Sequence, residues 1–152
     1  MTDFPTDAHF EALATRVLDR TLPHAEWTHE AHFAFALWML RHRPDRSNPE
    51  AFRTIIVALN EAHGTPNTDT SGYHHTITIA SLGAAGFVLG LREADRPLAA
   101  ALAELMVGPY GRSDWILAHW SREQLFSPEA RREWCEPDLE PLPWRGPPLP
   151  VS

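Results

Sequence analysis

Lysine is absent from this chain of 152 residues, so all 13 of its positively charged residues are arginine. This absence excludes Schiff-base chemistry, a lysine nucleophile and a phosphate-binding loop of the Gly-Lys-Ser/Thr type. Cysteine is almost absent too, because Cys135 stands alone. An internal disulfide, a Cys-x-x-Cys redox pair and a multi-cysteine zinc or iron–sulfur site are therefore excluded. The cysteine content favours a reducing, cytoplasmic environment.

Positive charge and long apolar runs are also scarce. The formal net charge is −7, which is not the electrostatic pattern of a nucleic-acid-binding protein. The first residues lack the basic and apolar succession of a signal peptide. The most apolar run, residues 77–91, contains Thr, Ser and Gly and is shorter than the ~18–20 residues of a membrane span. We therefore expect no nucleic-acid or membrane partner, and the sequence leaves a homo-oligomer open.

Helical periodicity, by contrast, recurs through most of the chain. Cap and stop signals bound seven predicted helices, within residues 6–23, 28–44, 47–64, 73–91, 95–107, 113–126 and from 127 onward. Turn formers fill residues 64–72, which we expect to form an irregular loop. Prolines recur in residues 137–150, which favours an extended tail. The sequence thus predicts a compact all-α bundle of about six to seven helices, with one domain at residues 1–136 and a tail at 137–152.

Histidine is abundant, with nine residues, and most of them lie between residues 24 and 75. His29 and His32 are three positions apart near a predicted helix start, so both project from one face. His74 follows the predicted polar loop at the start of another helix. If the two helix starts meet, three imidazoles converge as they do around a catalytic metal. We therefore predict one transition metal ion (copper, iron or zinc) on His29, His32 and His74.

Other polar residues near these histidines are candidates for catalysis. His75 points about 100° away from His74 on a helix, so it is expected outside the metal shell, with Tyr73 and Glu30 as further catalytic candidates. Glu26, His63 and Asp69 are alternative ligands or outer partners. The competing interpretation is structural: two histidines at the edge of a core, each satisfied by a backbone or carboxylate partner.

The predicted function is a metal-dependent enzyme acting on a small molecule. Iron or copper would support redox or oxygen chemistry, which we favour because the surroundings are rich in Trp and Phe. Zinc would instead support a hydrolase or hydratase. A non-catalytic module that binds a metal or a protein partner is the alternative from another class.

Two strings carry a resemblance to a known family. Residues 27–32, Trp-Thr-His-Glu-Ala-His, and residues 72–78, Gly-Tyr-His-His-Thr-Ile-Thr, resemble segments of a family of small bacterial proteins of unassigned function. Residues 127–139 look like the ending of the same family. The resemblance implies that His29, His32 and His74 are site residues, with Tyr73 beside them. This chain departs from the family at His75, where the family usually has Glu.

Overall fold

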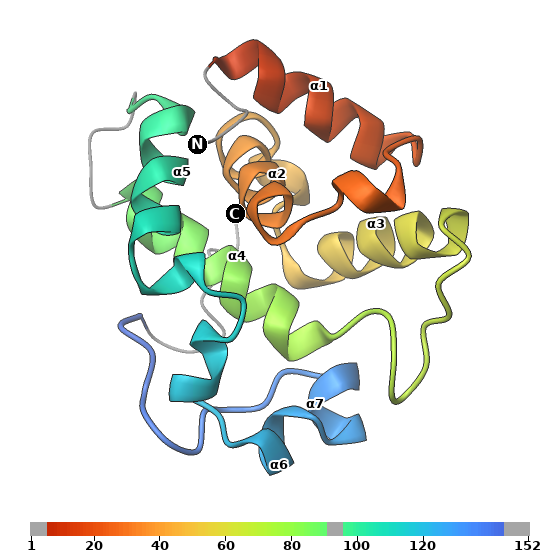
Figure 1. Cartoon of the computed structure of the whole chain (residues 1–152), viewed down its shortest axis with the longest axis vertical. Helices are drawn as coiled ribbons and strands as arrows, with labels where there is room; N and C mark the ends of the chain where they lie inside the picture. The colour runs from red at the N-terminus through yellow and green to blue at the C-terminus, as the bar shows by residue number, and fades with distance from the viewer. Residues whose placement is uncertain (1–5, 91–95, 145–152) are drawn as a thin grey trace.

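The computed structural model of the chain describes residues 6–90 and 96–144, which form an all-α fold without strands (Figure 1). The α helices are α1 (Asp7–Leu18), α2 (His29–His42), α3 (Pro49–Ala62), α4 (His75–Gly90), α5 (Leu98–Val107), α6 (Arg122–Leu125) and α7 (Pro128–Arg132). Short 3-10 helices connect some of them, at His24–Glu26, Pro44–Arg46, Pro109–Gly111 and Trp115–Ala118. The predicted fold class is confirmed.

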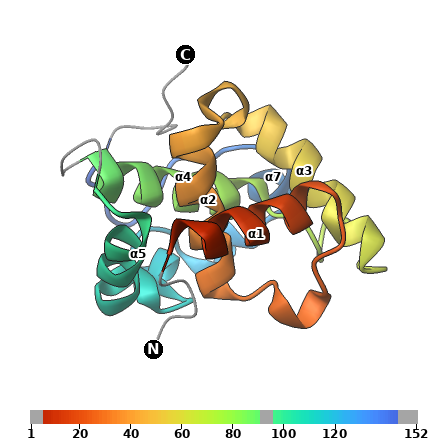
Figure 2. The ribbon, with the colours of Figure 1, turned by 90° about the horizontal axis from the view of Figure 1, so that it is seen from above.

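Helix α2 lies at the centre and packs against α1, α4 and α5 (Figure 2). Half of its residues are buried, among them Phe33, Leu37 and Met39, because neighbouring helices cover most of its circumference. Thr28 caps it as predicted, with its hydroxyl accepting a hydrogen bond from the Ala31 N–H. The first turn of α2 is thereby fixed against the core.

Side-chain caps also mark the starts of α3 and α7. Asn48 caps α3 through the Ala51 N–H, and Pro49 occupies the first helical position. Ser47, at the predicted start of this helix, is not the cap and donates its hydroxyl hydrogen to the Arg43 carbonyl oxygen. Ser127 caps α7.

The predicted helix at 113–126 is wrong, because the chain breaks there into the 3-10 helix Trp115–Ala118 and the short α6. Ser121 explains the break: its hydroxyl oxygen accepts a hydrogen bond from the Gln124 N–H and so starts a new helix. Asp138 accepts hydrogen bonds from both the N–H and the hydroxyl of Ser121. The cap is therefore anchored by a residue far along the chain.

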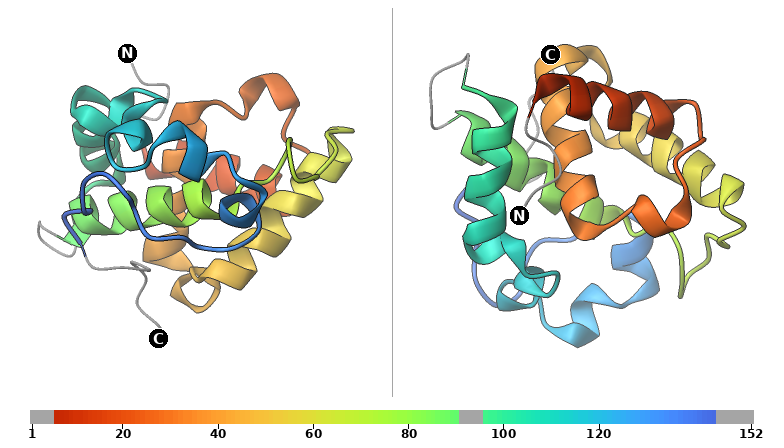
Figure 3. Two further views of the ribbon diagram at one scale, coloured as in Figure 1. Left: turned by 90° about the horizontal axis from the view of Figure 1, so that it is seen from below. Right: turned by 45° about the horizontal axis from the view of Figure 1, so that its top comes forward.

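The segment after α7 runs alongside α4 (Figure 3). At the start of α4, the Thr76 hydroxyl donates to the Glu133 carbonyl oxygen and accepts from the Cys135 N–H. Further along α4, the Phe87 ring packs against Trp144, with ring centroids 5.5 Å apart. Residues 145–152 of the predicted tail lie outside the described residues. Within the described ranges, no helix is both long and apolar enough to cross a membrane.

Candidate functional site

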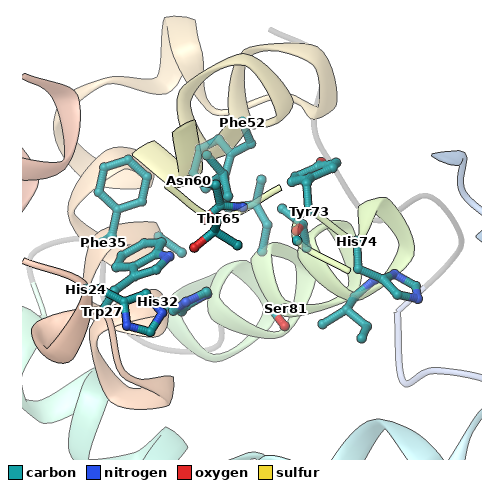
Figure 4. Close-up of a pocket in the computed structure, with 16 residues that line it drawn as sticks. His24, Trp27, His32, Phe35, Phe52, Asn60, Thr65, Tyr73, His74 and Ser81 are labelled. Atoms are coloured by element: carbon teal, nitrogen blue, oxygen red, sulfur yellow. The ribbon is translucent and has the colours of Figure 1, made fainter. Parts of the chain in front are cut away.

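A pocket of about 380 Å³ opens between α2, α3, the start of α4 and the loop at 64–72 (Figure 4). In Figure 4, His24, Trp27 and His32 gather at one end of this pocket and Tyr73 and His74 lie at the other. The remaining lining residues are Phe35, Ala36, Phe52, Ile56, Asn60, Thr65, Gly72, Ile77, Thr78, Ser81 and Leu82. The predicted meeting of two helix starts and the polar loop is therefore present as a cavity of small-molecule size.

His32 reaches this pocket from the first turn of α2. Its ring stacks on Trp27, with centroids 3.9 Å apart and an interplanar angle of 25°. Within the described ranges, neither of its ring nitrogens makes a hydrogen bond to the protein. The His32 side chain is exposed to solvent at the mouth of the pocket, and the atoms packed around it, followed by repulsion from His29, lower its pKa below the ordinary value. An oriented imidazole with two available ring nitrogens thus faces the cavity.

His74 occupies a different kind of position, because both of its ring nitrogens are used by the backbone. Nδ1 accepts a hydrogen bond from the Ile77 N–H at 3.2 Å, which caps α4. Nε2–H donates to the Leu125 carbonyl oxygen at 2.7 Å. These two bonds require the neutral Nε2–H tautomer. Burial is the main cause that lowers the pKa of His74, to about 4.

His29 points away from the pocket. Its Nε2 lies 2.7 Å from the Tyr110 carbonyl oxygen, to which it donates, so this side chain joins α2 to the 3-10 helix Pro109–Gly111. The predicted convergence of His29, His32 and His74 is therefore not found. No group of three or more His, Cys, Asp or Glu side chains placed to hold a metal ion occurs within residues 6–90 and 96–144. His29 and His74 each use Nε2–H to donate to a main-chain carbonyl oxygen instead.

The three predicted catalytic candidates do not share the pocket. The Tyr73 hydroxyl donates to His75 Nδ1 at 2.6 Å, and both side chains are buried. Burial raises the pKa of the Tyr73 phenol and lowers the pKa of His75. His75 does not line the pocket, and Glu30 lines a separate depression beside α1. Of these three candidates, only Tyr73 lines the pocket.

The alternative candidates have structural partners. The His63 Nε2–H donates to the Leu22 carbonyl oxygen at 2.7 Å, and its ring meets the edge of His24 at 5.2 Å between centroids. Glu26 forms an ion pair with Arg16, and Asp69 forms one with Arg132. None of these groups is directed into the pocket.

Hydrogen bonds hold the loop at 64–72 to α3 and to α7. Asn67 Oδ1 accepts hydrogen bonds from the Asn60 side-chain amide and from the Tyr73 N–H, each at 2.9 Å. Gly72 has a φ of +79°, and a Cβ there would overlap the carbonyl oxygen of Pro66. From α7, Arg131 donates to the carbonyl oxygens of Gly72 and Tyr73. The loop is thus a fixed wall of the site.

Several lining residues were not predicted as site residues from the sequence. Thr78 and Ser81 are three positions apart, so they lie on one face of α4, whose other residues are mainly apolar. A polar pair at helical spacing inside the most apolar run of the chain is the signal that could have identified them. His24 and Trp27 precede the predicted helix at 28–44 and carry no such signal.

Searches against protein-family models, curated proteins and solved structures found no match to this chain.

Proposed function

We propose that this chain is an enzyme that binds a small molecule in the pocket and uses the imidazole of His32 as its reactive group. The observation that carries the proposal is the environment of His32. It is the one predicted site histidine that opens into the cavity with both ring nitrogens free of hydrogen bonds to the described protein. Stacking on Trp27 orients the ring and leaves both of its nitrogens available to a ligand.

The chemistry that suits this group is general acid–base catalysis. A neutral imidazole has one nitrogen that can accept a proton from a bound molecule and one N–H that can donate. The hydroxyls of Thr78 and Ser81 line the same cavity and can orient polar groups of a ligand. Proton transfer by a positioned side chain contributes about 10²- to 10⁴-fold to a rate, which defines the expected size of the effect of removing it.

A metal-assisted form of this activity is the second candidate, and one observation favours it. His24 lies at the same end of the pocket as His32, so two imidazoles are available there (Figure 4). Zinc, copper or iron would accept such ligands, and the metal would decide between hydrolytic and redox chemistry. The metal would need further ligands from the substrate or water. Metal analysis of untagged protein after reconstitution tests this form, and less than about 0.2 metal ion per chain excludes it.

The main test is turnover of a panel of small molecules, followed by mass spectrometry, with wild-type protein and His32→Gln. His42→Gln is the matched control, because it makes the same substitution on an exposed residue of the same helix. We expect His32→Gln to lose at least about 100-fold in rate while the control retains it. If wild type binds a compound in the pocket but converts nothing, the protein is a binding module. Turnover that survives His32→Gln overturns the role of His32.

A further inference from the structure

The walls of the pocket carry no formal charge of their own. No Asp, Glu or Arg is among the residues that line it, within the part of the chain that the structure describes. Its ionisable side chains are His24, His32, Tyr73 and His74. Burial favours the neutral forms of His74 and Tyr73, because it lowers the pKa of His74 and raises the pKa of Tyr73, and His74 Nδ1 must be unprotonated to accept from the Ile77 N–H.

The two arginines next to the pocket, Arg53 and Arg131, do not line it. Arg53 stands over the Tyr73 ring, 5.7 Å from its centroid, but its guanidinium contacts Glu50 at 3.1 Å and Glu133 at 3.3 Å. Arg131 is engaged with two loop carbonyl oxygens. Because neither guanidinium is part of the lining, a charged ligand would meet no counter-ion on the walls of the pocket.

The chemistry of the walls favours an aromatic, mostly apolar ligand. Four aromatic side chains, of Trp27, Phe35, Phe52 and Tyr73, contribute to the lining. Polar atoms are supplied by neutral groups of Asn60, Thr65, Thr78 and Ser81. Hydroxyl and amide groups both donate and accept hydrogen bonds, so they satisfy carbonyl, hydroxyl or amide groups of a ligand. Such groups do not compensate the desolvation of a full charge, which costs several kcal/mol when it is left unpaired.

We infer that the pocket takes an uncharged, planar aromatic or heteroaromatic molecule that carries hydroxyl, carbonyl or amide groups. The inference rests on the proposed function in its metal-free form, since a bound metal ion would bring charge to the site. It narrows the substrate class from any small molecule to neutral ring compounds.

Three probes of almost identical shape test this inference: benzamide is neutral, benzoate is an anion and benzamidine is a cation at pH 7.5. Binding of each is measured by two-dimensional NMR titration of the wild-type protein. We expect benzamide to bind at least about tenfold more tightly than either charged probe, which corresponds to about 1.4 kcal/mol. Equal affinities, preference for a charged probe, or no binding of benzamide up to its solubility limit overturns the inference.

Two variants at one position place the probe in the pocket. Ser81→Asp introduces a carboxylate into the wall, and we expect it to raise the relative affinity for benzamidine. Ser81→Asn has nearly the same shape without charge and should preserve the wild-type order of affinities. If Ser81→Asp leaves the relative affinity for benzamidine as it is in the wild type, the probes bind elsewhere and the inference is overturned.

The outcomes separate this inference from the proposed function. A charged probe that binds best contradicts the substrate class but leaves the His32-dependent turnover open to its own test. Turnover independent of His32 contradicts the proposed function, while the ranking of the probes still defines the ligand class of the pocket.

Discussion

The imidazole of His74 joins the start of α4 to Leu125, a residue 51 positions later, through a hydrogen bond of 2.7 Å from Nε2–H to the carbonyl oxygen. The same ring caps α4 through Nδ1. His29 and His63 make equivalent bonds to the carbonyl oxygens of Tyr110 and Leu22. Histidines that sequence spacing suggested as ligands or outer partners of a metal thus connect distant segments of backbone.

Replacing His74 should therefore reduce stability in two separable steps. His74→Ala removes both the cap and the bond to Leu125, and we expect a loss of about 2–4 kcal/mol in the free energy of unfolding. His74→Asn keeps a good cap residue and should lose about half as much. Urea denaturation measures both variants. Equal losses for the two variants would contradict a capping role for Nδ1.

Stability should depend on pH through the same residue. Folding lowers the pKa of His74 from 6.5 to about 4, so the unfolded chain binds more protons between these values. The contribution is fully present above pH 6.5 and is lost as the pH falls toward 4, amounting to about 3 kcal/mol. Urea unfolding at several pH values should show this slope. His74→Asn should flatten it, and the part that remains is assigned to other buried histidines such as His75, whose pKa is also lowered.

Gly72 should tolerate substitution less well than Gly64, although both have positive φ values, of +79° and +76°. A Cβ at Gly64 meets no atom within 4 Å, so Gly64→Ala should cost only the backbone strain of about 1 kcal/mol. At Gly72 the Cβ would also overlap Pro66 and Asn67, and we expect a loss of about 3 kcal/mol. Thermal unfolding of the two variants measures this difference. Equal losses of stability would contradict the close packing of Gly72 against Pro66 and Asn67.

Replacing Arg131 should reduce stability more than replacing Arg132, its neighbour in α7. Arg132 forms an exposed ion pair with Asp69 at 3.0 Å, so Arg132→Gln should change the free energy of unfolding by less than about 1 kcal/mol. Arg131 donates to two backbone carbonyl oxygens of the loop, and Arg131→Gln should cost about 1–3 kcal/mol. Hydrogen exchange of loop amides should accelerate in the Arg131 variant alone. Similar exchange in both variants would show that Arg131 does not fasten the loop.

Local signals in the sequence predicted much of the fold because they act over a few residues. Thr28 and Ser127 cap helices at the predicted places and Asn48 caps one position after the predicted start at residue 47, since a cap needs only an N–H two or three positions ahead. Ser121 carries the same signal, but it lies within a stretch whose periodicity predicts one continuous helix. Its anchoring by Asp138 is a contact across 17 positions that spacing alone does not reveal.

The site was only partly predictable for a related reason. The sequence placed His32, Tyr73 and His74 near one another, and all three line the pocket. It did not reveal which histidines have their nitrogens occupied, because the partners are main-chain carbonyl oxygens. Every residue carries such an oxygen, so the partner of His29 or His74 leaves no mark in the sequence. Whether the histidines bind a metal stays a prediction.

The course of residues 133–144 along α4 has a consequence for biosynthesis. Thr76 and its partner Glu133 are 57 positions apart, and Leu142 belongs to the same buried cluster as Ala80, Trp115 and Trp120. While the ribosome is still producing these later residues, one side of the apolar helix α4 has no cover. The nascent chain therefore passes through an interval in which that side is open to chaperones, and the interval ends only when Leu142 has emerged.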